Sequence, residues 1–169
     1  MSAEQPGGVA ISSGRVLPEW IDINGHMNVA YYVLAFDLGV DNFWARLGIT
    51  DEYIETSKCS TFAAESHVTY KRELKQDDPF LITSQILAYD EKRIHQFQRM
   101  YHEEEKYLAA TAEWMNLHVD LTSRRVTPFP LPIMNALQEF TDDQGILPNP
   151  ELAGRIMTVS KPVFVGVER

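Results

Sequence analysis

The sequence has little cysteine, little positive charge and no long apolar segment. Cys59 is the single cysteine of 169 residues, so no intramolecular disulfide can form, and no spacing typical of zinc ligands is present. With 15 basic against 24 acidic residues, the net charge of −9 argues against nucleic acid or an anionic membrane as partner. No apolar run can span a bilayer, and residues 1–13 lack the basic start and apolar core of a secretory signal. We therefore expect a cytoplasmic protein.

The composition that is present is that of one folded domain. Hydrophobic residues make up 44% and charged residues 23% of the chain, and this length can bury a core. We expect a flexible tail over residues 1–13, a single domain over residues 14–140 and an extension over residues 141–169. The extension contains Pro148, Pro150 and Pro162 without a clear period, and we expect it to lie over the domain or to extend from it.

A long helix is predicted from Ala30 to Leu47. Asn28 is a favourable N-cap residue, and Gly48 is a favourable residue just after a helix end. Large apolar residues recur at helical spacing and define the expected buried stripe: Tyr31, Leu34, Leu38, Phe43 and Leu47, widened by Val33, Phe36, Val40 and Trp44.

After this helix the hydrophobic period changes to that of strands. Residues 50–56 carry a capping residue and acids and can form a short helix, and residues 14–17 can form a short strand. Four longer strand-like runs, residues 60–71, 80–89, 92–102 and 107–121, are joined by short polar turns, and residues 133–140 can form a helix. The run 92–102 is polar on both faces, which predicts solvent exposure on one side. We expect an α+β fold in which an antiparallel sheet of about five strands wraps around the long helix.

In the first long run we expect one face to carry Phe62, Ala64, Ser66, Val68 and Tyr70. Glu65 and His67 then share the other face, where an acid and a histidine are unusual if the face is buried. A solvated face or an interface hydrogen bond explains this pair as well as a catalytic role does.

Asp22 stands before the long helix, three residues ahead of Gly25. A tight turn here would place its carboxylate beside the unpaired amides of the helix N-terminus, a suitable place for chemistry on a carbonyl group. Asp22-Ile23-Asn24-Gly25 is equally an ordinary turn, and local chemistry alone leaves both interpretations open.

The segment Asp22-Ile23-Asn24-Gly25-His26-Met27-Asn28, leading into a helix with an early Tyr31-Tyr32, resembles the signature of hot-dog-fold acyl-CoA thioesterases, the relatives of 4-hydroxybenzoyl-CoA thioesterase. The sequence of residues 18–32, followed by Glu-Ser-His-Val-Thr-Tyr at 65–70, is most similar to the betainyl-CoA thioesterases associated with carnitine breakdown. The resemblance implies hydrolysis of an acyl-CoA thioester, no cofactor, and a homodimer or dimer of dimers with active sites at the subunit interface.

The resemblance also implies roles for individual residues. Asp22 is the catalytic carboxylate, acting as nucleophile or as base, and a backbone N–H of Asn28, Val29 or Ala30 is the oxyanion donor. Asn24 and His26 orient the acid or the leaving thiolate. A purely structural role for His26 is also open. Some relatives carry a second acid two residues before the first, or a histidine or tyrosine seven residues after it. Here those positions hold Trp20 and Val29, which puts the substrate and the detailed mechanism in doubt.

Further residues are candidates for the substrate. Glu65 of one subunit can complete a site begun by Asp22 of the other, with His67 beside it. Aromatic faces of Trp20, Tyr31 and Tyr32 near an acid can hold a quaternary ammonium group, and the basic residues that can meet coenzyme A phosphates are Lys71, Arg72, Arg93, Arg124 and Arg125. Two alternatives remain at this stage: a hot-dog dehydratase or hydratase, and a non-catalytic acyl-CoA-binding protein.

Overall fold

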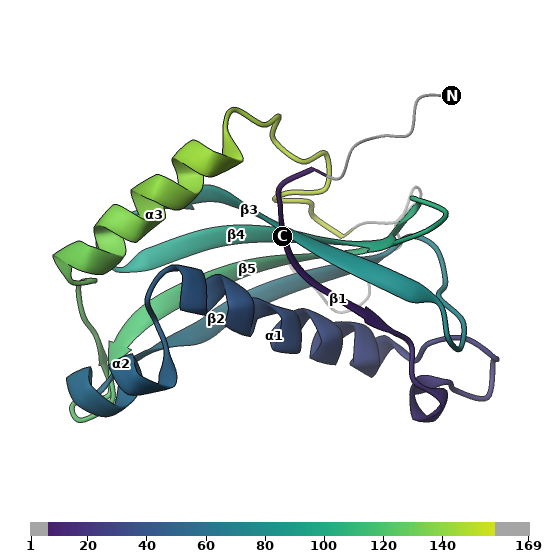
Figure 1. Ribbon diagram of the computed structural model, residues 1–169, viewed down its shortest axis with the longest axis horizontal. Helices are drawn as coiled ribbons and strands as arrows, with labels where there is room; N and C mark the ends of the chain where they lie inside the picture. The colour runs from purple at the N-terminus through teal and green to yellow at the C-terminus, as the bar shows by residue number, and fades with distance from the viewer. Residues whose placement is uncertain (1–6, 158–169) are drawn as a thin grey trace, which may run out of the picture.

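An antiparallel sheet curves around one long helix in the computed structural model, which describes residues 7–157 (Figure 1). The strands are β1 (Val9–Arg15), β2 (Cys59–Tyr70), β3 (Pro79–Tyr89), β4 (Arg93–His102), β5 (Leu108–Asp120) and β6 (Arg125–Val126). Their order is β1-β3-β4-β5-β2, and β6 pairs with β5. The expected hot-dog arrangement is confirmed, and β2 forms one edge of the sheet. No helix in the described part of the chain is long and apolar enough to cross a membrane.

The central helix α1 (Val29–Arg46) begins and ends where its capping residues predict. The side chain of Asn28 accepts a hydrogen bond from the Ala30 N–H at 3.0 Å, and Gly48 follows the helix with a φ of 81°. The buried face consists of Tyr32, Ala35, Phe36, Gly39 and Phe43.

The predicted buried stripe of α1 is therefore wrong in part, because Leu34 and Leu38 are exposed. A helix that is apolar on most sides has no single hydrophobic face for the sequence to reveal. Gly39 instead faces the sheet, where an added Cβ would lie 3.2 Å from both Ile82 and Ser12. This absence of a side chain lets the helix approach the sheet closely.

The shorter elements refine the boundaries expected from sequence. The tail predicted for residues 1–13 is wrong from Val9 onward, because β1 begins there and pairs with β3. The helix α2 (Asp51–Ser57) is capped by Thr50, and a 3-10 turn, η1 (Pro18–Trp20), precedes Asp22. The last helix, α3 (Leu131–Gln144), is longer at both ends than predicted.

The segment after α3 lies over the sheet, one of the two alternatives expected. The carbonyl of Pro148 accepts a hydrogen bond from Gln85, and the N–H of Gly154 donates to the Glu113 carboxylate at 2.9 Å. Expectations for residues 1–6 and 158–169 lie outside the described residues.

Two strands differ from the predicted pattern. A bulge between Ala63 and Glu65 in β2 shifts the register, so Phe62 lies on the face opposite to Ser66, Val68 and Tyr70. In β4 the predicted exposure is wrong, since Gln96 and Gln98 are fully buried in the middle of the sheet.

Hydrogen bonds between side chains explain how the buried polar residues of β4 are accommodated. Gln96 donates to Ser84 at 2.8 Å and accepts from Asn116 at 3.2 Å. Gln98 accepts from the indole N–H of Trp114 at 2.7 Å. Polar side chains that form hydrogen bonds with one another in this way can lie in the middle of the sheet, so polarity alone does not identify an exposed face.

One buried hydrogen bond ties the start of α1 to the β2–β3 connection. The hydroxyl of Tyr32 accepts the Leu74 N–H at 2.9 Å, and both residues are buried.

Removing the hydroxyl in Tyr32→Phe leaves that N–H unpaired, so we expect a loss of about 1–3 kcal/mol in the free energy of unfolding. Urea denaturation measures it. The control is Tyr31→Phe, since the Tyr31 hydroxyl makes no hydrogen bond within residues 7–157. Equal stabilities of the two variants would contradict the expected role.

Candidate active site

Asp22 lies in a tight turn that the backbone closes at both ends. Ile21 and Met27 form an antiparallel bridge, and the Asp22 N–H donates to the His26 carbonyl at 3.0 Å. Gly25 has a φ of 80°, a conformation that a residue with a side chain seldom adopts. The turn predicted from Asp-x-Asn-Gly is confirmed.

The Asp22 carboxylate is held on one oxygen and open on the other. Its Oδ1 accepts the main-chain N–H of Asn24 at 2.8 Å, and the His26 Nδ1 lies 3.9 Å from the same oxygen. The His26 Nδ1 also lies 3.2 Å from the Met27 carbonyl, which leaves its Nε2 free to face other groups. Asp22 Oδ2 makes no hydrogen bond within residues 7–157, and the side chain is 19% exposed. This oxygen can therefore meet a substrate or a water molecule.

Three backbone amides are candidates for the oxyanion donor, and two of them already donate hydrogen bonds within the protein. The Asn28 N–H donates to the Trp20 carbonyl at 2.9 Å, and the Ala30 N–H donates to the Asn28 side chain. The Val29 N–H has no acceptor among the described residues, and its residue is 54% exposed. It is also the first N–H of α1, where the helix dipole favours negative charge.

A cavity of about 230 Å³ adjoins this helix end. It is lined by His26, Met27, Val29, Tyr32, Tyr70, Lys71, Arg72 and Glu73. Lys71 and Arg72 thus lie near the turn, as a phosphate-binding role requires. The Arg72 guanidinium is already engaged, because it pairs with Glu105 at 3.2 Å and lies 3.7 Å from the centre of the Tyr107 ring.

The aromatic residues around Asp22 pack against one another and against the core. Trp20 is only 9% exposed and stacks on Tyr31, with ring centroids 5.5 Å apart, and on Phe80. Tyr32 is 4% exposed, and its burial raises the pKa of the phenol. Both residues therefore pack mainly in the core, although Tyr32 also lines the cavity beside the turn, and their part in substrate binding stays a prediction.

Glu65 and His67 lie on the face of the sheet away from α1. They line a cavity of about 530 Å³ with His95 and Glu113, whose side chains are 2.6 Å apart. Within one chain the structure does not bring Glu65 to Asp22, and its contribution to a partner's site stays a prediction.

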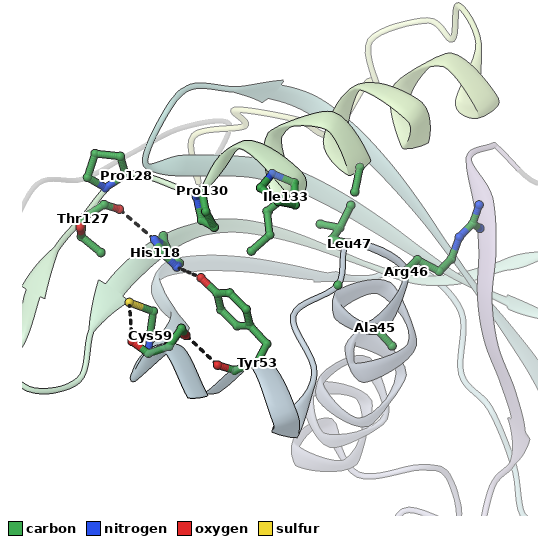
Figure 2. A pocket seen from close by; sticks show the side chains of 14 residues that line it. Ala45, Arg46, Leu47, Tyr53, Cys59, His118, Thr127, Pro128, Pro130 and Ile133 are labelled. Atoms are coloured by element: carbon green, nitrogen blue, oxygen red, sulfur yellow. Dashed lines mark hydrogen bonds between the residues drawn. The ribbon is translucent and has the colours of Figure 1, made fainter. Parts of the chain in front are cut away.

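A larger cavity, of about 670 Å³, lies at the opposite end of α1 (Figure 2). There the His118 Nδ1 donates to the Thr127 carbonyl at 3.0 Å, and its Nε2 lies 2.8 Å from the Tyr53 hydroxyl oxygen. No sequence pattern predicts this contact between residues 65 positions apart. Cys59 also lines the cavity, and its sulfur lies 3.6 Å from the Ser57 carbonyl. This cavity is mostly apolar and lies at the end of α1 away from the Asp22 turn.

Comparisons with known proteins identify the family. A family model described as the thioesterase-like superfamily matches residues 16–140. Betainyl-CoA thioesterase from Pseudomonas aeruginosa is 32% identical over 142 residues, which cover 84% of this chain and 89% of that protein. L-carnitine dehydrogenase/betainyl-CoA thioesterase from Rhizobium meliloti is 32% identical over 154 residues, or 91% of this chain but only 31% of that protein.

Solved structures show the same similarity. A hypothetical protein from Staphylococcus aureus, determined in complex with CoA, superposes with a TM-score of 0.85 and 29% identity, covering 92% of this chain and 99% of that one. A putative thioesterase from Pseudomonas putida gives a TM-score of 0.78 and 27% identity, with 92% and 98% of the two chains covered.

Proposed function

The chain belongs to the thioesterase-like superfamily, and we propose that it uses Asp22 to hydrolyse the thioester of betainyl-CoA or a similarly small acyl-CoA. The reaction class, hydrolysis of an acyl-CoA thioester, is that of its family and of its relatives. The observation that carries the assignment to Asp22 is the pairing of an open carboxylate oxygen with the unpaired Val29 N–H at the same end of α1.

Both groups have defined parts in the reaction. Asp22 Oδ2 either attacks the thioester carbonyl carbon or takes a proton from the water that does. In each route negative charge develops on the carbonyl oxygen, where the Val29 N–H and the positive end of the α1 dipole stabilise it. The carbon–sulfur bond then breaks, and the CoA thiolate takes up a proton. If Asp22 is the nucleophile, water then hydrolyses the acyl–Asp22 anhydride and regenerates the carboxylate. In both routes water supplies the new oxygen of the carboxylic acid.

The substrate assignment draws on the named relatives and on charge. The similar proteins from Pseudomonas aeruginosa and Rhizobium meliloti are betainyl-CoA thioesterases by name. An acidic protein, with a net charge of −9, favours a cationic acyl group over an anionic one. The CoA phosphates then meet the local positive charge of Lys71 and Arg72 beside the Asp22 turn.

A homodimer is part of this proposal. The edge strand β2 has exposed residues from Phe62 to Ser66, and an open edge of this length favours pairing with a second chain. The apolar side chains that α1 leaves exposed, Val29, Val33, Leu34 and Leu38, add surface that a partner can cover. A cytoplasmic location remains a prediction.

Replacing Asp22 by asparagine tests the carboxylate. Asp22→Asn preserves the shape and the Oδ1 acceptor but removes the charge, so we expect kcat to fall by on the order of 10² or more, the usual effect of losing a positioned acid or base. The KM should change much less, because the amide still fills the site. Release of free thiol from acyl-CoA measures both. Glu19→Gln, at a neighbouring exposed acid, is the control, and wild-type turnover by Asp22→Asn would reduce Asp22 to a turn residue.

The oxyanion donor can be removed without disturbing the helix. Val29 occupies the first position of α1, where proline is well tolerated, and Asn28 already has the extended conformation that a following proline requires. We expect Val29→Pro to fold normally and to lose about 10²–10³ in kcat, as when an oxyanion-hole donor is deleted. Val29→Ala keeps the N–H and should stay close to wild type. Full activity of the proline variant would exclude this N–H as the donor.

The preference for a cation is tested with two acyl groups of equal shape. In the neutral analogue, 3,3-dimethylbutanoyl-CoA, a tert-butyl group replaces trimethylammonium. We expect kcat/KM to be about tenfold to a few hundredfold higher for betainyl-CoA, from cation–π and charge interactions of roughly 0.5–2 kcal/mol each. Equal or faster hydrolysis of the neutral thioester would rule out a cation pocket.

A further inference from the structure

A small cavity of about 80 Å³ lies between the middle of α1 and the concave face of the sheet. From α1 it is lined by Asp37, Val40 and Trp44, which share one face of the helix at spacings of three, four and seven residues, and by Phe36. Trp114 of β5 closes the cavity from the sheet, and Thr61 and Ala63 of β2 form its wall on the side of the open sheet edge. Two indole rings and a carboxylate therefore meet at one small space.

The surroundings of this cavity are negatively charged. A groove of about 560 Å³ shares Asp37, Val40, Trp44 and Thr61 with it, and adds the carboxylates of Asp41 and Asp51. Neither the cavity nor the groove has a lysine, arginine or histidine among its lining residues. An anionic ligand would find no basic side chain to pair with here. A cation would find the carboxylates of Asp37, Asp41 and Asp51.

The indole of Trp114 is fixed by a buried residue. Gln98 is 0% exposed, lines the cavity, and accepts the indole N–H at 2.7 Å. The indole N–H can only donate a hydrogen bond, so the Gln98 atom that it contacts must be the amide oxygen. The amide nitrogen of Gln98 then points away from the indole. That nitrogen is buried without a hydrogen-bond partner in the described part of the chain. The part of Gln98 at this cavity is therefore to hold the indole ring of Trp114 through its oxygen.

We propose that this cavity holds the quaternary ammonium head of the acyl group, an inference that rests on the proposed function and adds its specificity site. Trp44 and Trp114 supply aromatic faces, and indole is the best side chain for attracting a cation. Asp37 supplies the countercharge. The amide groups of Gln96, Gln98 and Asn116 also line the space, and they make it a poor site for an aliphatic chain.

The position of the cavity requires a second subunit. Only one methylene separates the carbonyl carbon of a betainyl group from its nitrogen, so the ammonium site must lie next to the oxyanion donor. Asp37 follows Val29 by eight residues, which is about 12 Å along the helix axis. The Asp22 and Val29 of one chain are therefore too far from the cavity of the same chain.

Two-fold pairing of the β2 edges brings the two parts together. Tyr70, near the end of β2, donates a hydrogen bond to the Val29 carbonyl at 3.3 Å, whereas Thr61 and Ala63, near its beginning, line the cavity. In an antiparallel pair centred on the exposed residues 62–66, the end of one β2 lies beside the beginning of the other. Each site then combines Asp22 and the Val29 N–H of one protomer with Asp37, Trp44 and Trp114 of its partner.

The first test compares the two isosteric substrates, betainyl-CoA and 3,3-dimethylbutanoyl-CoA, in matched variants. We expect Asp37→Asn to lower the ratio of their kcat/KM values about tenfold, and Trp44→Leu to do the same, because each removes a cation-specific contact. Trp44→Phe keeps an aromatic face and should retain most of the preference. Glu139→Gln, at an exposed acid of α3 that lines neither the cavity nor the groove, should leave the ratio within about twofold of wild type.

The outcomes separate the two proposals. If the wild-type protein does not prefer betainyl-CoA, the proposed substrate and the ammonium site both fail. If it prefers betainyl-CoA but Asp37→Asn and Trp44→Leu keep the wild-type ratio, the substrate stands and this site is overturned. A general defect in folding lowers kcat/KM for both substrates by the same factor and leaves their ratio unchanged. It therefore cannot produce the expected change in the ratio.

The second test asks whether the site is shared between subunits. Asp22→Asn and the double variant Asp37→Asn/Trp44→Leu are co-expressed with different tags, and the heterodimer is purified through both tags. A shared site predicts one intact site in each heterodimer and about half of the wild-type activity on betainyl-CoA, although each parent is impaired. A heterodimer no more active than its parents would show that both parts act within one chain, and recovery of only monomers would overturn the arrangement.

Discussion

One long helix has to be buried on the concave face of a single curved sheet, and much of this molecule follows from that requirement. The sheet covers α1 along its length, while α3 packs beside it through Ile133, Leu137 and Phe140. The chain must therefore enter and leave α1 at the two ends of the helix. At the entry, the chain turns sharply through Asp22 to Met27 before Asn28 caps the helix. The turn that the fold needs to start its helix is thus also the place where a carboxylate and an unpaired amide come together.

The sequence predicts this entry well because the signals are local. Asn28, Gly25 and Gly48 specify a cap, a turn and a helix end through conformations that few other residues adopt. Only the resemblance to a family gave the turn a chemical role, since Asp-x-Asn-Gly is an ordinary turn. The choice of Val29 among three amides needed the structure, because the partners of Asn28 and Ala30 are set by the folded loop.

The errors arise where long-range contacts outweigh local pattern. Gln96 and Gln98 make β4 look exposed, yet their side chains form hydrogen bonds with Ser84, Asn116 and Trp114 from neighbouring strands, which no periodicity shows. Leu34 and Leu38 look buried, although α1 turns a different face to the sheet. Trp20 looks available to a ligand, but it fills the core below α1. The wall of the small cavity draws on α1, β2, β4 and β5, and its members are spread from Phe36 to Asn116.

The bulge at Ala64 has a consequence for the fidelity of assembly. A regular edge strand can pair with almost any other strand, and a slip of two residues would leave its side chains on the same faces. In β2 the extra residue divides the strand into two halves whose alternation is out of phase. If a second strand pairs in a wrong register, a regular part of that strand lies opposite the bulge. Hydrogen bonds between the two strands are then lost at that point. The same distortion that shapes one wall of the cavity thus makes this exposed edge a poor template for open-ended aggregation.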